Sequence, residues 1–68
     1  MNEETFNMSI RKFLKMVGVR SQTEIERAVA KAIADGKLKG SEAFPARMQL
    51  TIGKVSLNLT LDGEIKLE

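Results

Sequence analysis

The clearest hydrophobic pattern in the chain is an alternation of apolar and polar residues from Ala46 to Leu61. Because successive side chains of a strand point to opposite faces, this spacing predicts two strands that share one apolar face. Gly53 and Lys54 interrupt the alternation and are predicted to form a two-residue hairpin loop, since glycine adopts the positive φ that such loops need. The apolar positions are Ala46, Met48, Leu50, Ile52, Val55, Leu57, Leu59 and Leu61. The two-residue loop at Gly53-Lys54 would pair Ile52 with Val55, Leu50 with Leu57 and Met48 with Leu59.

A helix is predicted over residues 3–17. Asn2 is a suitable N-cap, and the acidic residues Glu3 and Glu4 fall in the first turn, where the helix dipole favours negative charge. The apolar residues at helical spacing are Phe6, Ile10, Phe13, Leu14 and Val17. Gly18 is expected to end this helix in a left-handed conformation.

A second helix is predicted over residues 22–35. Ser21 and Glu24 match the S-x-x-E capping box, in which each side chain accepts a hydrogen bond from the other residue's backbone N–H. The apolar stripe of this helix is Ile25, Ala28, Val29, Ala32 and Ile33, and Gly36 is expected to end it. The two helices would meet at a sharp corner.

Residues 37–44 are predicted to form a loop, with Leu38 and Phe44 as its anchors in the core. Pro45 marks the entry to the first strand, because proline has no N–H to donate to a central ladder.

After the hairpin, Asp62-Gly63 is a strong turn signal. A two-residue turn there would pair Thr60 with Ile65 and would move the last apolar residues to the polar face. A three-residue loop of Leu61-Asp62-Gly63, with Gly63 in the left-handed region, pairs Leu59 with Ile65 and is preferred.

The predicted fold is therefore α+β, with two N-terminal helices packed on a three-stranded antiparallel β-meander in the order ααβββ. The expected single domain of residues 1–68 has helices at about 3–17 and 22–35 and strands at about 46–52, 55–60 and 64–67.

The size of the chain indicates a dimer. A single core in 68 residues supplies only about 3–5 kcal/mol, and the sequence has no Cys for disulfides and neither Cys nor His for a zinc site. Oligomerisation is the remaining common source of stability, so a homodimer is expected.

Two surfaces are candidates for the dimer contact. Small residues occupy the outward side of the second helix, and the outer face of the hairpin carries only one charge, at Arg47. The candidate residues are Ala30, Ala34, Gln49, Thr51, Asn58 and Thr60. The small residues also fit ordinary helix propensity, and the uncharged polar residues also fit ordinary strand composition. The alternative that neither surface is a contact therefore stays open.

The sequence offers little for catalysis. It lacks His, Cys, Tyr and Trp, and its carboxylates show no local spacing of a catalytic dyad or a metal site. No catalytic, cofactor-binding or metal-binding residue is predicted. The chain is expected to be non-enzymatic and to need no cofactor.

Nucleic-acid binding is the alternative function. A helix, a short turn, a capped second helix and a β-ribbon resemble part of a winged helix-turn-helix. The cations that would carry the contacts are Arg11, Lys15, Arg20, Arg27 and Lys31. Three features argue against this function, which ranks below protein interaction. Only two helices precede the ribbon, where the winged form normally has three, the acidic Glu26 lies beside the proposed base-reading residues, and the Gly53-Lys54 loop is too tight for a typical wing.

The first partner expected is a second copy of the chain, and another protein is a further candidate. No signal peptide and no run of about 20 apolar residues is present, so a cytoplasmic location without a membrane partner is expected.

Several segments resemble a family of short bacterial proteins classed as a domain of unknown function. The resemblance is carried by residues 6–15, 17–19, 21–26, 36–40 and 62–65. It implies a bacterial cytoplasmic protein of this full length, and it carries no activity and no site residues.

Overall fold

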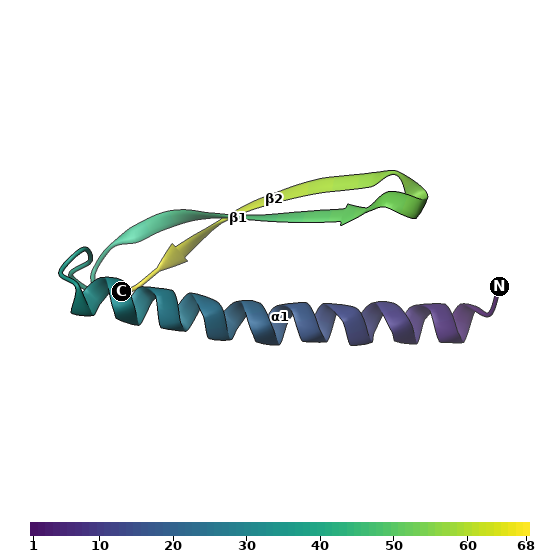
Figure 1. Cartoon of the computed structure of the whole chain (residues 1–68), viewed down its shortest axis with the longest axis horizontal. Helices are drawn as coiled ribbons and strands as arrows, with labels where there is room; N and C mark the ends of the chain where they lie inside the picture. Colours follow the sequence, from purple (N-terminus) through teal and green to yellow (C-terminus); the bar gives the residue numbers. More distant parts are fainter. The chain divides into compact units, whose positions relative to one another are not determined.

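The computed structural model describes all 68 residues, which form two compact units, Met1–Lys37 and Leu38–Glu68. The first unit contains one helix, and the second contains a β-hairpin (Figure 1). The elements are helix α1 (Glu3–Ala34), strand β1 (Ala43–Ile52), the 3₁₀ turn η1 (Gly53–Val55) and strand β2 (Leu57–Lys66). The predicted fold of two helices on a three-stranded meander is therefore wrong.

Helix α1 runs without interruption through the predicted corner at residues 18–21. Gly18 lies in the helix interior and has no positive φ, and a methyl group added there would meet no atom within 4 Å. A glycine costs a helix only about 1 kcal/mol relative to alanine, so the continuous backbone hydrogen bonding outweighs it. The capping box is also absent, because Ser21 and Glu24 both lie inside α1.

The two ends of α1 agree with the sequence. The Asn2 side chain accepts a hydrogen bond of 3.0 Å from the Thr5 backbone N–H, which confirms the predicted N-cap. At the other end Gly36 adopts a φ of 78°. The backbone N–H of Gly36 donates to the Ile33 carbonyl at 3.1 Å, and that of Lys37 donates to the Ala32 carbonyl at 2.8 Å. These two bonds make a Schellman motif, which satisfies carbonyls that a helix end leaves free.

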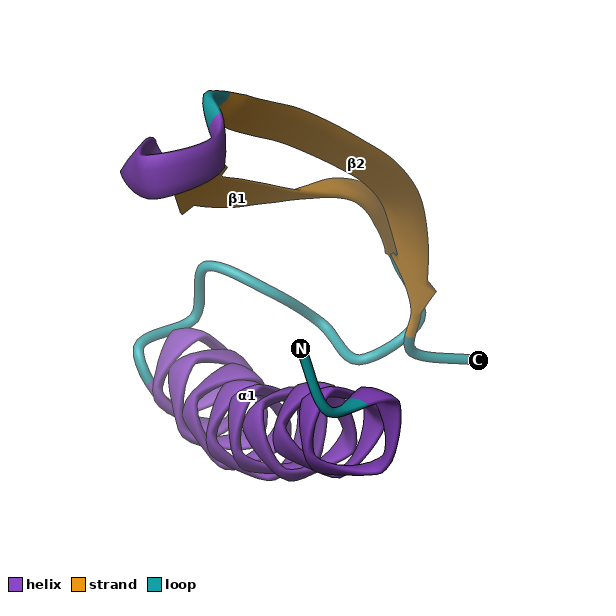
Figure 2. Cartoon of the chain, turned by 90° about the vertical axis from the view of Figure 1, so that its right-hand side faces the viewer, coloured by secondary structure: helices purple, strands orange, loops and turns teal.

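The hairpin is longer than predicted, and its register differs by two residues. Ile52 pairs with Leu57 and Leu50 with Leu59, so four residues from Gly53 to Ser56 make the loop. The loop closes through η1, seen at the tip of the hairpin in Figure 2, and Ser56 follows it with a φ of 53°. The predicted two-residue loop is wrong because this turn places its left-handed residue at Ser56 and none at Gly53.

Strand β2 continues through Asp62 and Gly63, where a turn was predicted. Gly63 pairs with Ala46 and has no positive φ, so both the three-residue loop and the third strand are wrong. The physical reason lies in the alternation itself. Leu61, Gly63 and Ile65 keep the same parity as the earlier apolar residues, so one continuous strand already places Ile65 on the apolar face.

A two-stranded sheet consists entirely of edge strands. This explains why Pro45, which pairs with Glu64 inside β1, is tolerated without an N–H to donate. Leu38 and Phe44, the expected anchors, are only half-buried, and no side chain in the 68 residues is fully buried. The chain therefore forms regular elements without a closed hydrophobic core of its own.

Candidate interaction surfaces

The hairpin carries one continuous apolar face. Opposite residues of an antiparallel pair lie on the same face, so the register sets Leu50 beside Leu59 and Met48 beside Leu61. We call this surface the apolar hairpin face, and it consists of Phe44, Ala46, Met48, Leu50, Ile52, Leu57, Leu59, Leu61 and Ile65. Leu59 is 42% exposed and Leu61 is 52% exposed. Such a face is typical of a surface that another protein covers.

The opposite face of the hairpin is polar. Gln49 pairs with Thr60 and Thr51 with Asn58, so four of the predicted dimer-contact residues do lie together on this face. The single charge expected there is balanced, because the Arg47 Nε donates to the Asp62 carboxylate at 2.8 Å. All of these side chains are exposed and need no cover, so this face ranks below the apolar face as a contact surface.

Helix α1 presents apolar side chains along most of its length. Phe6 is 48% exposed, Phe13 is 44% exposed and Leu14 is 54% exposed. Ala30 and Ala34, the other predicted contact residues, are exposed. At about 100° per residue, Ala30 lies about 100–120° around the helix from Phe13 and Phe6, and Ala34 lies about 60–80° from them. The structure thus places the six contact candidates on two separate elements, with four of them together on the polar face of the hairpin.

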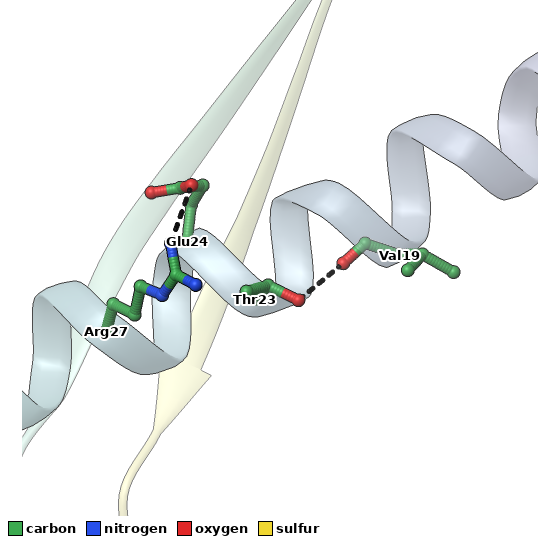
Figure 3. Close-up of polar contacts among 4 residues, drawn as sticks. All are labelled: Val19, Thr23, Glu24 and Arg27. Atoms are coloured by element: carbon green, nitrogen blue, oxygen red, sulfur yellow. Dashed lines mark hydrogen bonds and ion pairs between the residues drawn. The ribbon is translucent and has the colours of Figure 1, made fainter.

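The basic residues of α1 differ in their surroundings. Arg27 pairs with Glu24 at 3.7 Å (Figure 3), and Lys31 pairs with Asp35 at 2.9 Å. The other predicted nucleic-acid contacts, Arg11, Lys15 and Arg20, make no ion pair. The five cations are spread along one straight element, and the helix-turn-helix on which the nucleic-acid hypothesis depended is absent.

Two features in the middle of α1 replace the predicted capping box. The Glu24 carboxylate turns toward Arg27 in the next helical turn, as Figure 3 shows. The Thr23 hydroxyl donates to the Val19 carbonyl at 3.1 Å, a bond by which threonine is accommodated inside a helix.

The loop that precedes β1, inside the unit Leu38–Glu68, holds a carboxylate that the sequence did not single out. The Glu42 Oε1 accepts hydrogen bonds from the backbone N–H groups of Gly40 at 2.9 Å and Ser41 at 3.1 Å, and Oε2 accepts one from Lys39 at 2.8 Å. Gly40 has a φ of 108°, which brings these N–H groups to one side. Bonds from Lys39 and Gly40 are the main cause of a pKa of Glu42 below its ordinary value of 4.5. The only sign in the sequence was Gly40, four residues after the helix stop at Gly36.

We expect Glu42→Gln to loosen this loop. A lowered pKa means that the folded state binds the proton less readily than the unfolded state, so the Glu42 contribution is present above the ordinary pKa of 4.5 and is lost as pH falls through the lower folded value. In the wild type, the protection factors of the Lys39, Gly40 and Ser41 amides, which are corrected for the pH dependence of intrinsic exchange, should fall only on acidification. In Glu42→Gln these protection factors should be low at neutral pH already. Glu64→Gln is the control, and equal exchange in the two variants would contradict the assignment.

No group of three or more His, Cys, Asp or Glu side chains is placed to hold a metal ion. No helix combines the length and the apolar character that crossing a membrane requires.

One comparison with known protein families gives a match to the chain. The model of DUF6494, a family of unknown function, matches residues 1–68. The chain belongs to the DUF6494 family. The match spans both α1 and the hairpin of this DUF6494 chain and confirms the resemblance seen in the sequence. No curated protein and no solved structure matches it significantly.

Proposed function

We propose that this DUF6494 chain is a small non-enzymatic interaction module that works as a homodimer through its apolar surfaces. The observation that carries the proposal is the apolar hairpin face, of which Met48, Ile52 and Leu61 are each more than 40% exposed. Taking a leucine-sized side chain from full exposure to full burial stabilises a protein by about 1.5–3 kcal/mol, and covering the exposed part of each of these side chains contributes a share of that.

The hairpin also needs support from outside itself. An isolated two-stranded hairpin is marginally stable in water, and both strands of this one are edges. A second copy supplies the same apolar surfaces at equal concentration, and a two-fold interface is self-complementary. The 68-residue chain without Cys or His gains from association the stability that a disulfide or a zinc ion gives other small domains.

The proposal is tested by molar mass and unfolding. Light scattering is expected to give twice the chain mass of 7.6 kDa at micromolar concentration. The thermal unfolding midpoint should rise with protein concentration, because association stabilises the folded state by mass action. A molar mass equal to that of one chain at high micromolar concentration, together with an unfolding midpoint that does not depend on concentration, would refute the homodimer.

A further inference from the structure

The continuity of α1 brings residues of the two predicted apolar stripes onto one line, and eight positions along this line are spaced symmetrically. These positions, called here the α1 stripe, are seven residues of the predicted stripes and the polar Ser21: Phe6, Ile10, Phe13, Val17, Ser21, Ile25, Ala28 and Ala32. Leu14, Val29 and Ile33 of the predicted stripes lie outside this symmetrical set. Successive members are separated by 4, 3, 4, 4, 4, 3 and 4 residues, an order that is the same from either end. A two-fold axis beside Val19 therefore maps the stripe of one chain onto that of an antiparallel copy.

The sizes of the side chains fit this pairing. In the antiparallel arrangement the large residues of the first half lie opposite smaller residues of the second half. The facing pairs are Phe6 with Ala32, Ile10 with Ala28, Phe13 with Ile25, and Val17 with Ser21. Large residues opposite small ones interdigitate at the density of protein interiors. A parallel copy would instead crowd Phe6 against Phe6 at one end and leave Ala32 facing Ala32 at the other.

The charges of α1 favour the same orientation. No acidic residue occurs between Thr5 and Thr23, and the four cations of that segment make no ion pair. They are Arg11, Lys12, Lys15 and Arg20. A parallel pair would bring two such segments together at the cost of like-charge repulsion. An antiparallel pair sets each beside residues 15–33 of the partner, where Glu24 and Glu26 offset two of the four cations and leave a net charge of +2. The repulsion is therefore weaker than between two segments that each carry four cations and no acid.

We propose that α1 pairs antiparallel with α1 of a second copy, along the α1 stripe and with the crossing point near Val19. This inference rests on the proposed homodimer and adds a helix contact to the contact proposed for the apolar hairpin face. The stripe advances 26 residues in seven steps, a mean of about 3.7 residues, which is close to the 11-residue repeat of straight or slightly right-handed pairs. A left-handed heptad coiled coil is not expected.

Disulfide trapping tests the orientation, because the natural chain has no Cys. Two single-Cys chains, Ile10→Cys and Ala28→Cys, are mixed under mild oxidation, and the products are separated by intact mass. Positions 10 and 28 face each other in the antiparallel pair, whereas two copies of position 10 lie about 27 Å apart, beyond the reach of a disulfide. The mixed disulfide should make up nearly all of the linked product.

Each outcome decides a different point. Ala28→Cys alone, a mild change in a helix, should remain unlinked while light scattering still gives the dimer. Rapid linking of Ala28→Cys to itself would establish a parallel pair and overturn the orientation. A dimer that forms no disulfide in the mixture would show that the α1 stripe is not the contact. A monomeric mass for the wild type would instead refute the homodimer on which the inference rests.

Discussion

Leu59→Asp is expected to dissociate the dimer into a monomer that unfolds with little cooperativity. Leu59 lies at the middle of the apolar hairpin face, directly opposite Leu50. The substitution removes about 1.5–3 kcal/mol of apolar burial per copy and places a charge where no cation faces it. Light scattering and urea unfolding followed by circular dichroism measure the effect.

Thr60→Asp is the matched control, since Thr60 is the next residue of β2 and lies on the opposite, polar face. It introduces the same charge and the same residue of low strand propensity, so its cost should stay within about 1 kcal/mol and the dimer should persist. The reverse result, with Thr60→Asp monomeric and Leu59→Asp dimeric, would make the polar face the interface and overturn the proposed surface.

Gly18→Pro is expected to destroy most of the cooperative helical structure of α1. Proline at position 18 removes the hydrogen bond to the Leu14 carbonyl and its ring collides with that carbonyl, at a cost of about 3 kcal/mol or more. The helical circular dichroism signal at 222 nm should fall sharply, and the dimer should weaken because the α1 stripe is broken in the middle.

Gly18→Ala tests the same position in the opposite direction. Alanine is the better helix former by about 1 kcal/mol, and space is free around Gly18, so the helical signal and the unfolding midpoint should both rise. Replacing Gly36 by alanine should instead lower the unfolding midpoint, because the φ of 78° at this position is unfavourable for a residue with a side chain. Tolerance of Gly18→Pro without loss of helix would show that the chain turns at residue 18 after all.

The sequence alone determined which side chains share a face. The alternation from Ala46 onward predicted the apolar hairpin face, and the predicted and observed registers differ by two residues. A shift by two leaves every side chain on the same face, so the pattern alone does not separate the two registers. The geometry of the loop from Gly53 to Ser56 decided between them.

The sequence also determined the outer ends of α1, where Asn2 and Gly36 act through local hydrogen bonds. It did not determine whether the chain turns at Gly18 or at Asp62-Gly63, because each of these local signals amounts to only about 1 kcal/mol. Only the three-dimensional structure decided that both segments remain regular. Backbone hydrogen bonding along a helix and along a strand is cooperative, and extending an element that already exists costs less than starting a new one.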